Sequence, residues 1–107
     1  MLTQNSDWVT LLNVNESPLD RPLLVNIHGN DIIIFRHGGH YVAIDRWCPH
    51  QNGDLGQGRV LAKAIKCPLH GFMFSVETGR GINCGGFNVR VHEIQLENGL
   101  LSVRLKC

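Results

Sequence analysis

Residues 48–71 read CPHQNGDLGQGRVLAKAIKCPLHG, and this stretch decides how the rest of the chain is interpreted. It contains two short loops, CPH at 48–50 and CPLH at 67–70, separated by sixteen residues. Each loop offers one thiolate and one imidazole, and both groups are common metal ligands. So short a spacing suits a tight loop around a metal better than one face of a helix, and the proline after each cysteine restricts the backbone there. The expected ligands are Cys48, His50, Cys67 and His70.

The order of these ligands indicates which metal they bind. Zinc fingers commonly pair cysteine with cysteine and histidine with histidine, whereas each loop here mixes the two. If the loops face each other, the two cysteines can bind one iron and the two histidines a second iron. This is the ligand set of a Rieske [2Fe-2S] centre. A zinc site that stabilises a small binding module remains the alternative.

Strand patterns flank this stretch on both sides. Apolar and polar residues alternate with a period of two, and no segment of ten or more residues has a helical stripe. Glycine-containing pairs at 29–30, 38–39 and 98–99 predict tight turns between strands. We therefore expect an all-β fold. Its expected strands are residues 8–14, 23–28, 31–36, 40–46, 89–96 and 100–105.

The middle of the chain has a different character. It is rich in glycine and offers only short strand candidates, around 60–66 and 72–76. This pattern indicates a subdomain inserted into the sheet. A chain of 107 residues suits one domain. The expected divisions are a single domain over 1–107, a base of about 1–46 and 80–107, and a cluster-binding subdomain of about 47–79.

Composition excludes several classes of partner. Ten Lys and Arg balance nine Asp and Glu, so the net charge of +1 does not favour nucleic acid or anionic membranes. The longest apolar runs are four residues, against about 18 for a membrane span. The start, MLTQNSDWVT, does not have the pattern of a secretory signal. We expect a cytoplasmic, reducing setting, where the four cysteines serve metal or redox chemistry rather than disulfides.

The C-x-H motif, its sixteen-residue spacer and the sequence CPLHG at 67–71 closely resemble the Rieske ferredoxins. The resemblance covers nearly the whole chain. It implies an antiparallel β-sandwich base with a cluster-binding subdomain inserted between its strands. It also implies a [2Fe-2S] cluster, bound by Cys48, His50, Cys67 and His70.

The same resemblance implies an electron carrier rather than an enzyme. Ferredoxins of oxygenase systems take single electrons from a flavin or iron–sulfur reductase and pass them to a terminal oxygenase. That oxygenase is a ring-hydroxylating dioxygenase or a di-iron aromatic monooxygenase, and the motif does not distinguish them. We expect a monomer or weak oligomer. A Rieske-like small subunit of a larger reductase is the alternative that the motif leaves open.

Residues near the motif predict the reduction potential. In the high-potential Rieske proteins that oxidise quinols, a disulfide crosses the cluster, and serine and tyrosine hydroxyls donate hydrogen bonds to sulfur. None of these features occurs at the matching positions, which are Gly53, Leu69, Phe72 and Phe74. We therefore expect a potential near the lower end of the Rieske range of about −150 to +300 mV.

The remaining cysteines and histidines are interpreted as structural. Residues 79–88 read GRGINCGGFN and lack the proline that many relatives have in the corresponding loop. Cys84 in this loop is expected to be a thiol without a redox role, with a position near the cluster as the alternative, and the final Cys107 is expected to be a free terminal thiol. His28 and His92 are expected to be strand residues that face water.

Overall fold

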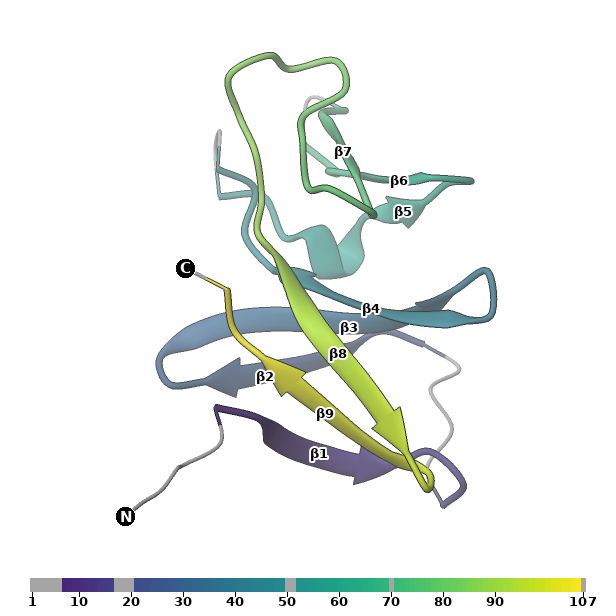
Figure 1. The fold of residues 1–107 in the computed structure, drawn as a ribbon. Helices are drawn as coiled ribbons and strands as arrows, with labels where there is room; N and C mark the ends of the chain where they lie inside the picture. Colours follow the sequence, from purple (N-terminus) through teal and green to yellow (C-terminus); the bar gives the residue numbers. More distant parts are fainter. Residues whose placement is uncertain (1–6, 17–20, 50–51, 70, 107) are drawn as a thin grey trace.

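The computed structural model describes residues 7–16, 21–49, 52–69 and 71–106, which form an all-β fold (Figure 1). The expected fold class is confirmed. The one helix within these ranges is a three-residue 3₁₀ turn, so no helix there is long enough to cross a membrane. The elements are β1 (Val9–Asn13), β2 (Leu23–Ile27), β3 (Asn30–His37), β4 (His40–Asp45), η1 (Leu55–Gln57), β5 (Arg59–Val60), β6 (Ala64–Lys66), β7 (Met73–Ser75), β8 (Val91–Glu97) and β9 (Leu100–Arg104).

Six strands form the main antiparallel sheet, in the order β1-β9-β8-β4-β3-β2. β3 is buried on both of its faces. Its residues 32–35 read IIIF, and each is at most 3% exposed. Successive side chains of a strand point to opposite faces, so alternate residues of this run enter two different apolar clusters. One cluster lies within the main sheet, and the other joins the sheet to the segment that contains the predicted metal site.

Residues in the left-handed backbone conformation form the tight turns of the main sheet. The expected turns at 38–39 and 98–99 are present, with φ between 53° and 83° at all four residues. The turn after β2 differs from the prediction by one residue, because His28 and Gly29 have positive φ and Asn30 already pairs in β3. The Asn30 side chain donates to the carbonyl at the end of β2 (3.2 Å), which favours this register.

Between β4 and β8 the chain leaves the main sheet and forms a smaller sheet, in the order β5-β6-β7 (Figure 1). The stretch around 60–66, expected to contain short strand candidates, folds as the two short strands β5 and β6. A backbone hydrogen bond from Leu61 N to Ala64 O (2.7 Å) closes the turn between them. The strand predicted around 72–76 is present as β7.

Residues 80–89 pack on the smaller sheet. Gly81 forms a β-bridge with Phe74 of β7, and Val89 N donates to Gly79 O (2.8 Å). Cys84 and Val89 belong to the same apolar cluster as the predicted cysteine ligands. We therefore propose to place the boundary after residue 89 instead of 79, and we name residues 47–89 the insert and the remainder of the chain the base.

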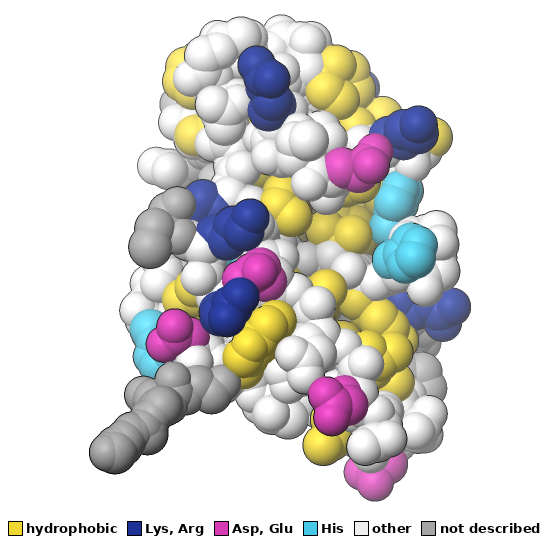
Figure 2. Space-filling view, viewed as in Figure 1, with side chains coloured by type: hydrophobic (Ala, Val, Ile, Leu, Met, Phe, Trp, Pro, Cys, Tyr) yellow, Lys and Arg dark blue, Asp and Glu magenta, His cyan; other side chains and the backbone are white. Residues whose placement is uncertain are grey.

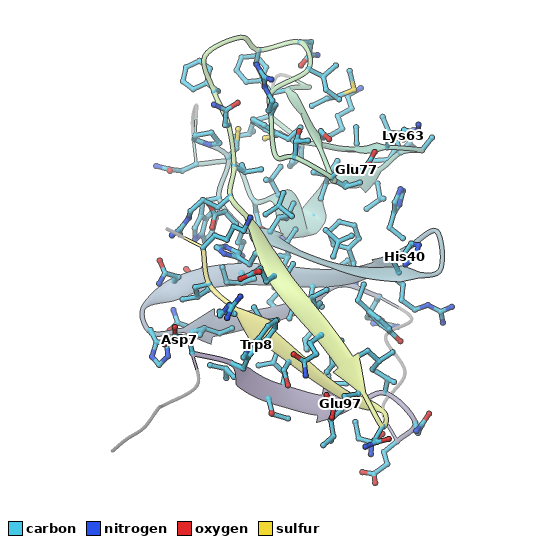
Figure 3. The ribbon with its side chains drawn as sticks, in the orientation of Figure 1. Asp7, Trp8, His40, Lys63, Glu77 and Glu97 are labelled. Atoms are coloured by element: carbon cyan, nitrogen blue, oxygen red, sulfur yellow. The ribbon has the colours of Figure 1, made fainter. Side chains whose placement is uncertain are left out.

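The insert contacts the base at the tip of the β3–β4 hairpin. There His37 Nε2 forms a hydrogen bond with the carbonyl of Ala62 in the insert (2.5 Å). Figure 3 shows His40 on the base side of this contact, and Lys63 and Glu77 on the insert side. A shallow groove of about 440 Å³ follows the contact.

Hydrogen bonds also join the two segments of the base that lead into and out of the insert. Asp45, at the end of β4, accepts hydrogen bonds from Arg90 N (2.9 Å) and Arg90 Nε (3.0 Å). The expectation that His92 faces water is wrong, because His92 is 3% exposed. Its Nδ1 accepts from Lys106 N (3.0 Å), so its Nε2 donates to Asp45 (2.9 Å). Burial alone would raise the pKa of Asp45, but the hydrogen bonds from His92 and Arg90 outweigh it and lower this pKa to about 2.

Candidate metal centre

The first motif lies directly after β4, in a loop that closes on itself. Cys48 N donates to Gly53 O, and Asn52 N donates back to Cys48 O, both at 2.8 Å. Asn52 adopts a left-handed conformation with φ of 56°, which lets the chain reverse within so few residues. Trp47 fixes the start of the loop to the base, because its Nε1 donates to the carboxylate of Asp31 (2.9 Å).

The second motif forms the turn between β6 and β7. Cys67 N donates to Phe72 O (2.7 Å), and Gly71 has φ of 67° within this turn. The backbone N–H of Leu69 donates to the Cys67 sulfur. A sulfur that accepts such a bond is better able to carry negative charge, as a metal-bound thiolate must.

The structure brings the two predicted cysteine ligands together. Each is 1% exposed, and both lie in the apolar cluster beneath the two loops. Burial raises the pKa of the Cys67 thiol above its usual value and the nearby Cys48 thiol raises it further, while the Leu69 N–H acts in the opposite direction. A shared metal would resolve this cost, because metal binding deprotonates the thiols.

Close packing of the two loops explains the glycine at position 53. A Cβ at Gly53 would lie 2.5 Å from the Cys67 sulfur and 3.3 Å from Leu69. No residue with a side chain fits there unless the loops move apart. The two loops therefore face each other, as the order of ligands requires for a shared site.

His50 and His70 lie outside the described residues. Their chain neighbours on the described segments belong to the two facing loops. Within the part of the chain that the structure describes, no group of three or more His, Cys, Asp or Glu residues could bind a metal. The geometry thus brings together two of the four predicted ligands, and the donor set fits an iron–sulfur cluster with two further ligands from the same loops.

Asn83 is a site residue that the sequence analysis missed. Its side-chain oxygen accepts from Met73 N (2.9 Å), and its side-chain nitrogen donates to Gly71 O (3.1 Å). Ile82 N also donates to Met73 O (2.8 Å). The 81–87 segment thereby fixes both ends of the stretch that directly follows the second motif. The one signal for it in the sequence is the short run Gly81-Ile82-Asn83.

Cys84 is buried beside this segment, and its thiol donates to Met73 O (3.6 Å). A Cβ at Gly81 would lie 2.8 Å from the Cys84 sulfur, so the two residues pack closely. Cys84 is a free thiol near enough to Cys67 to contribute to the raised pKa of that thiol, and its lack of a redox role remains a prediction. Cys107 lies outside the described residues.

Apolar side chains surround the two loops. Phe74 is fully buried, and Phe72 packs against Phe87 with 6.1 Å between ring centroids. Leu69 and Ile82 are exposed by 45% and 57%, so an apolar surface lies next to the motif. The positions that carry hydroxyl donors in high-potential proteins are apolar here, and the low potential remains a prediction.

A family profile and individual known proteins were found to be similar to this chain. A profile of the Rieske [2Fe-2S] domain matches residues 7–93. The ferredoxin component of the naphthalene 1,2-dioxygenase system of Pseudomonas aeruginosa is 26% identical, over 92% of this chain and 95% of the relative. The 5,5'-dehydrodivanillate O-demethylase oxygenase subunit of Sphingobium sp. is 35% identical over 58% of this chain, which matches 14% of that longer relative.

Solved structures agree with this result. The ferredoxin of carbazole 1,9a-dioxygenase from Nocardioides aromaticivorans has a TM-score of 0.81 and 26% identity, covering 94% of this chain and all of that chain. A ferredoxin solved in complex with the oxygenase of carbazole 1,9a-dioxygenase has a TM-score of 0.79 and 25% identity, covering 94% of each chain.

Proposed function

This chain belongs to the Rieske [2Fe-2S] domain family, and we propose that it acts as a ferredoxin that carries single electrons from a reductase to a terminal oxygenase. The observation that supports this most directly is the pair of buried cysteines, placed side by side by two facing loops. The chain also matches 95% of the ferredoxin component of a naphthalene 1,2-dioxygenase system. It is an electron carrier and not an enzyme.

We propose that Cys48 and Cys67 bind one iron of the cluster, and that His50 and His70 bind the other. When bound, the cluster accepts and releases one electron at a time. The two cysteines are fully buried, so the protein excludes water from the sulfur ligands. The Leu69 N–H stabilises negative charge on Cys67, and Asn83 holds the segment that follows His70.

The exposed apolar side chains beside the loops supply a contact surface for redox partners. Leu69 and Ile82 border the second loop and Trp47 borders the first. A small apolar surface suits a weak and transient encounter, which an electron carrier needs in order to leave after each transfer. The related carbazole dioxygenase ferredoxin forms a complex with its oxygenase. We extend that kind of partner to this chain, together with a flavin or iron–sulfur reductase and a cytoplasmic location.

The class of oxygenase is left open between two kinds. Relatives include ferredoxin components of a naphthalene 1,2-dioxygenase system and of an alkene monooxygenase system. We therefore propose that the terminal oxygenase is a ring-hydroxylating dioxygenase or a di-iron monooxygenase.

An absorption spectrum of the purified protein tests this function. We expect a red-brown protein that bleaches on addition of dithionite and then transfers one electron per cluster to an added oxidant. A zinc-stabilised binding module would be colourless and would show no redox change. A permanent small subunit of a larger reductase would be coloured, but would co-purify with its large partner instead of behaving as a free monomer or weak oligomer.

A further inference from the structure

Charge is distributed unevenly between the insert and the base. Residues 47–89 contain four cations against two acidic residues, whereas the rest of the chain contains six cations against seven acidic residues. On the face drawn in Figure 2, Asp and Glu side chains gather mainly below the insert. One of the two acidic residues of the insert, Asp54, is already paired with Arg46 of the base (2.9 Å). The insert is therefore cationic, although the net charge of the whole chain is only +1.

Two of these cations lie directly opposite each other. Arg59 of β5 and Lys66 of β6 are register partners in the small sheet, and both are exposed. Like charges in such positions repel and cost stability. Within the described segments neither side chain has an ion-pair partner. This repulsion is reduced if an anionic group from another molecule binds between them.

These two side chains line a groove that reaches the metal centre. Its volume is about 440 Å³, and Cys67, a proposed iron ligand, is one of its lining residues. Lys66 extends over the second loop, because its Cε and Nζ lie 3.1 and 3.9 Å from the position of a Cβ on Gly71. The other lining residues are Gln57, Gly58, Pro68 and Gly71. None of the described residues that line the groove is acidic.

The affinity of an anionic ligand for this groove should depend on the redox state of the cluster. Reduction adds one negative charge beside the groove, so a bound anionic segment is repelled more strongly in the reduced protein than in the oxidised one. By thermodynamic linkage, such a segment binds the oxidised carrier more tightly and lowers its reduction potential. An electron donor must bind the oxidised carrier and release the reduced one, and an electron acceptor must do the reverse.

We propose that the Arg59–Lys66 groove binds an acidic segment of the reductase that supplies electrons to this protein. The inference rests on the proposed ferredoxin function and names the chemistry of one of its two partners. In the encounter the reduced flavin or iron–sulfur centre of the reductase loses one electron and the cluster gains it, with no bond formed or broken. Weaker binding of the reduced product then assists its release toward the oxygenase.

The test uses the full-length, cluster-loaded protein and a peptide of eight glutamates, with a peptide of eight glutamines as the neutral probe. Dissociation constants are measured at low ionic strength for the oxidised protein and for the protein reduced with dithionite. We expect the glutamate peptide to bind the oxidised protein several-fold more tightly. Each tenfold ratio of dissociation constants corresponds to a potential lower by about 59 mV with peptide bound.

Exposed-residue variants locate the binding site. Arg59→Gln combined with Lys66→Gln should weaken glutamate-peptide binding at least tenfold. Arg36→Gln is the matched control, because Arg36 is exposed on β3 of the base and has no ion-pair partner among the described residues. Arg36→Gln should leave binding unchanged.

Three outcomes would overturn parts of this inference separately. Unchanged binding in the double variant, or an equal loss in the Arg36 control, would refute the groove as the site. Equal or tighter binding to the reduced protein would refute the assignment to the electron donor. A protein without iron or a reducible cluster would refute the proposed function itself, and this is established before any peptide is added.

Discussion

The base and the insert are stabilised by different means. In the base, β3 and β4 pair over six residues and carry apolar side chains that fill clusters on both faces. In the insert, β5, β6 and β7 contain only two or three residues each. Strands this short contribute few ladder hydrogen bonds, so the shape of the insert depends on its loops. We therefore expect the base to keep its fold through its own apolar core, and the insert to depend on its metal.

The two regions nevertheless share one apolar cluster. Ile33, Phe35 and Ile44 of the base contact the core of the insert, which contains the two proposed cysteine ligands. The metal site therefore lies directly above the base. Loss of the metal should loosen the insert first and leave the cluster within the base intact.

The largest expected effect comes from removing a cysteine ligand. Cys67→Ser should abolish cluster binding, because a hydroxyl is a poor ligand for iron and metal binding is part of the folding free energy of this region. Iron content and hydrogen exchange provide the measurements. We expect fast exchange across the insert and retained protection in β3, β4, β8 and β9. Cys84→Ser, which alters a buried thiol that donates to the backbone carbonyl of Met73, should keep its iron. Simultaneous loss of protection in both regions would show that the base does not fold independently.

A substitution at Gly53 should have the next largest effect. Gly53→Ala places a methyl group 2.5 Å from the Cys67 sulfur, so the two loops must separate. Overpacking of this kind typically costs about 1–3 kcal/mol. We expect lower iron occupancy and faster cluster loss at 37 °C. Gly85→Ala is the control, because a Cβ there has no atom within 4 Å. Equal cluster lifetimes in the two variants would show that the loops are not closely packed.

Asp45 tests the hydrogen bonds that join the two segments of the base on either side of the insert. Its folded pKa of about 2 lies below the ordinary value of 3.8, so its ionised form stabilises the fold above about pH 4. This stabilisation is lost as pH falls from about 4 to 2. Asp45→Asn should therefore lower the free energy of unfolding by about 2 kcal/mol at pH 7.

Urea unfolding at several pH values measures this effect. The difference between Asp45→Asn and the unaltered protein should shrink as the pH falls and disappear near pH 2. Glu97→Gln, at an exposed position of β8, serves as the control and should show little difference at any pH. A difference for Asp45→Asn that does not change with pH would contradict the role assigned to its charge.

The smallest expected effect concerns the reduction potential. Phe72→Ser introduces a hydroxyl at the position that corresponds to a sulfur-bonding serine in high-potential relatives. One such bond that favours the reduced cluster by about 1 kcal/mol raises the potential by roughly 40 mV. A redox titration of the loaded variant measures this shift. An unchanged or lower potential would refute the explanation offered for a low-potential cluster.

The sequence predicted the base better than the insert, for a physical reason. The apolar run at 32–35 and the turns at 38–39 and 98–99 are local signals, and each forms as expected. The turn at 28–29 was missed by one residue, because its register depends on the side chain of Asn30. His92 was misplaced because its burial depends on Asp45 and the C-terminal segment, which are distant in sequence.

In the insert the informative contacts are nonlocal. The turn between β5 and β6 contains neither glycine nor proline, so no local pattern marks the boundary between the two strands. Asn83 acts through backbone atoms of Gly71 and Met73, which no periodicity reveals. The assignment of the four candidate ligands rests on their spacing and residue types and remains a prediction. The structure places two of them side by side.

Pulsed EPR of the reduced protein, grown with ¹⁵N-labelled histidine, tests the ligand assignment most directly. A cluster with His50 and His70 on one iron predicts two nitrogen couplings that change with the label. One of the two should be lost in His50→Cys or in His70→Cys, and neither in His28→Ala. A reduced cluster without histidine nitrogen coupling would contradict the assignment.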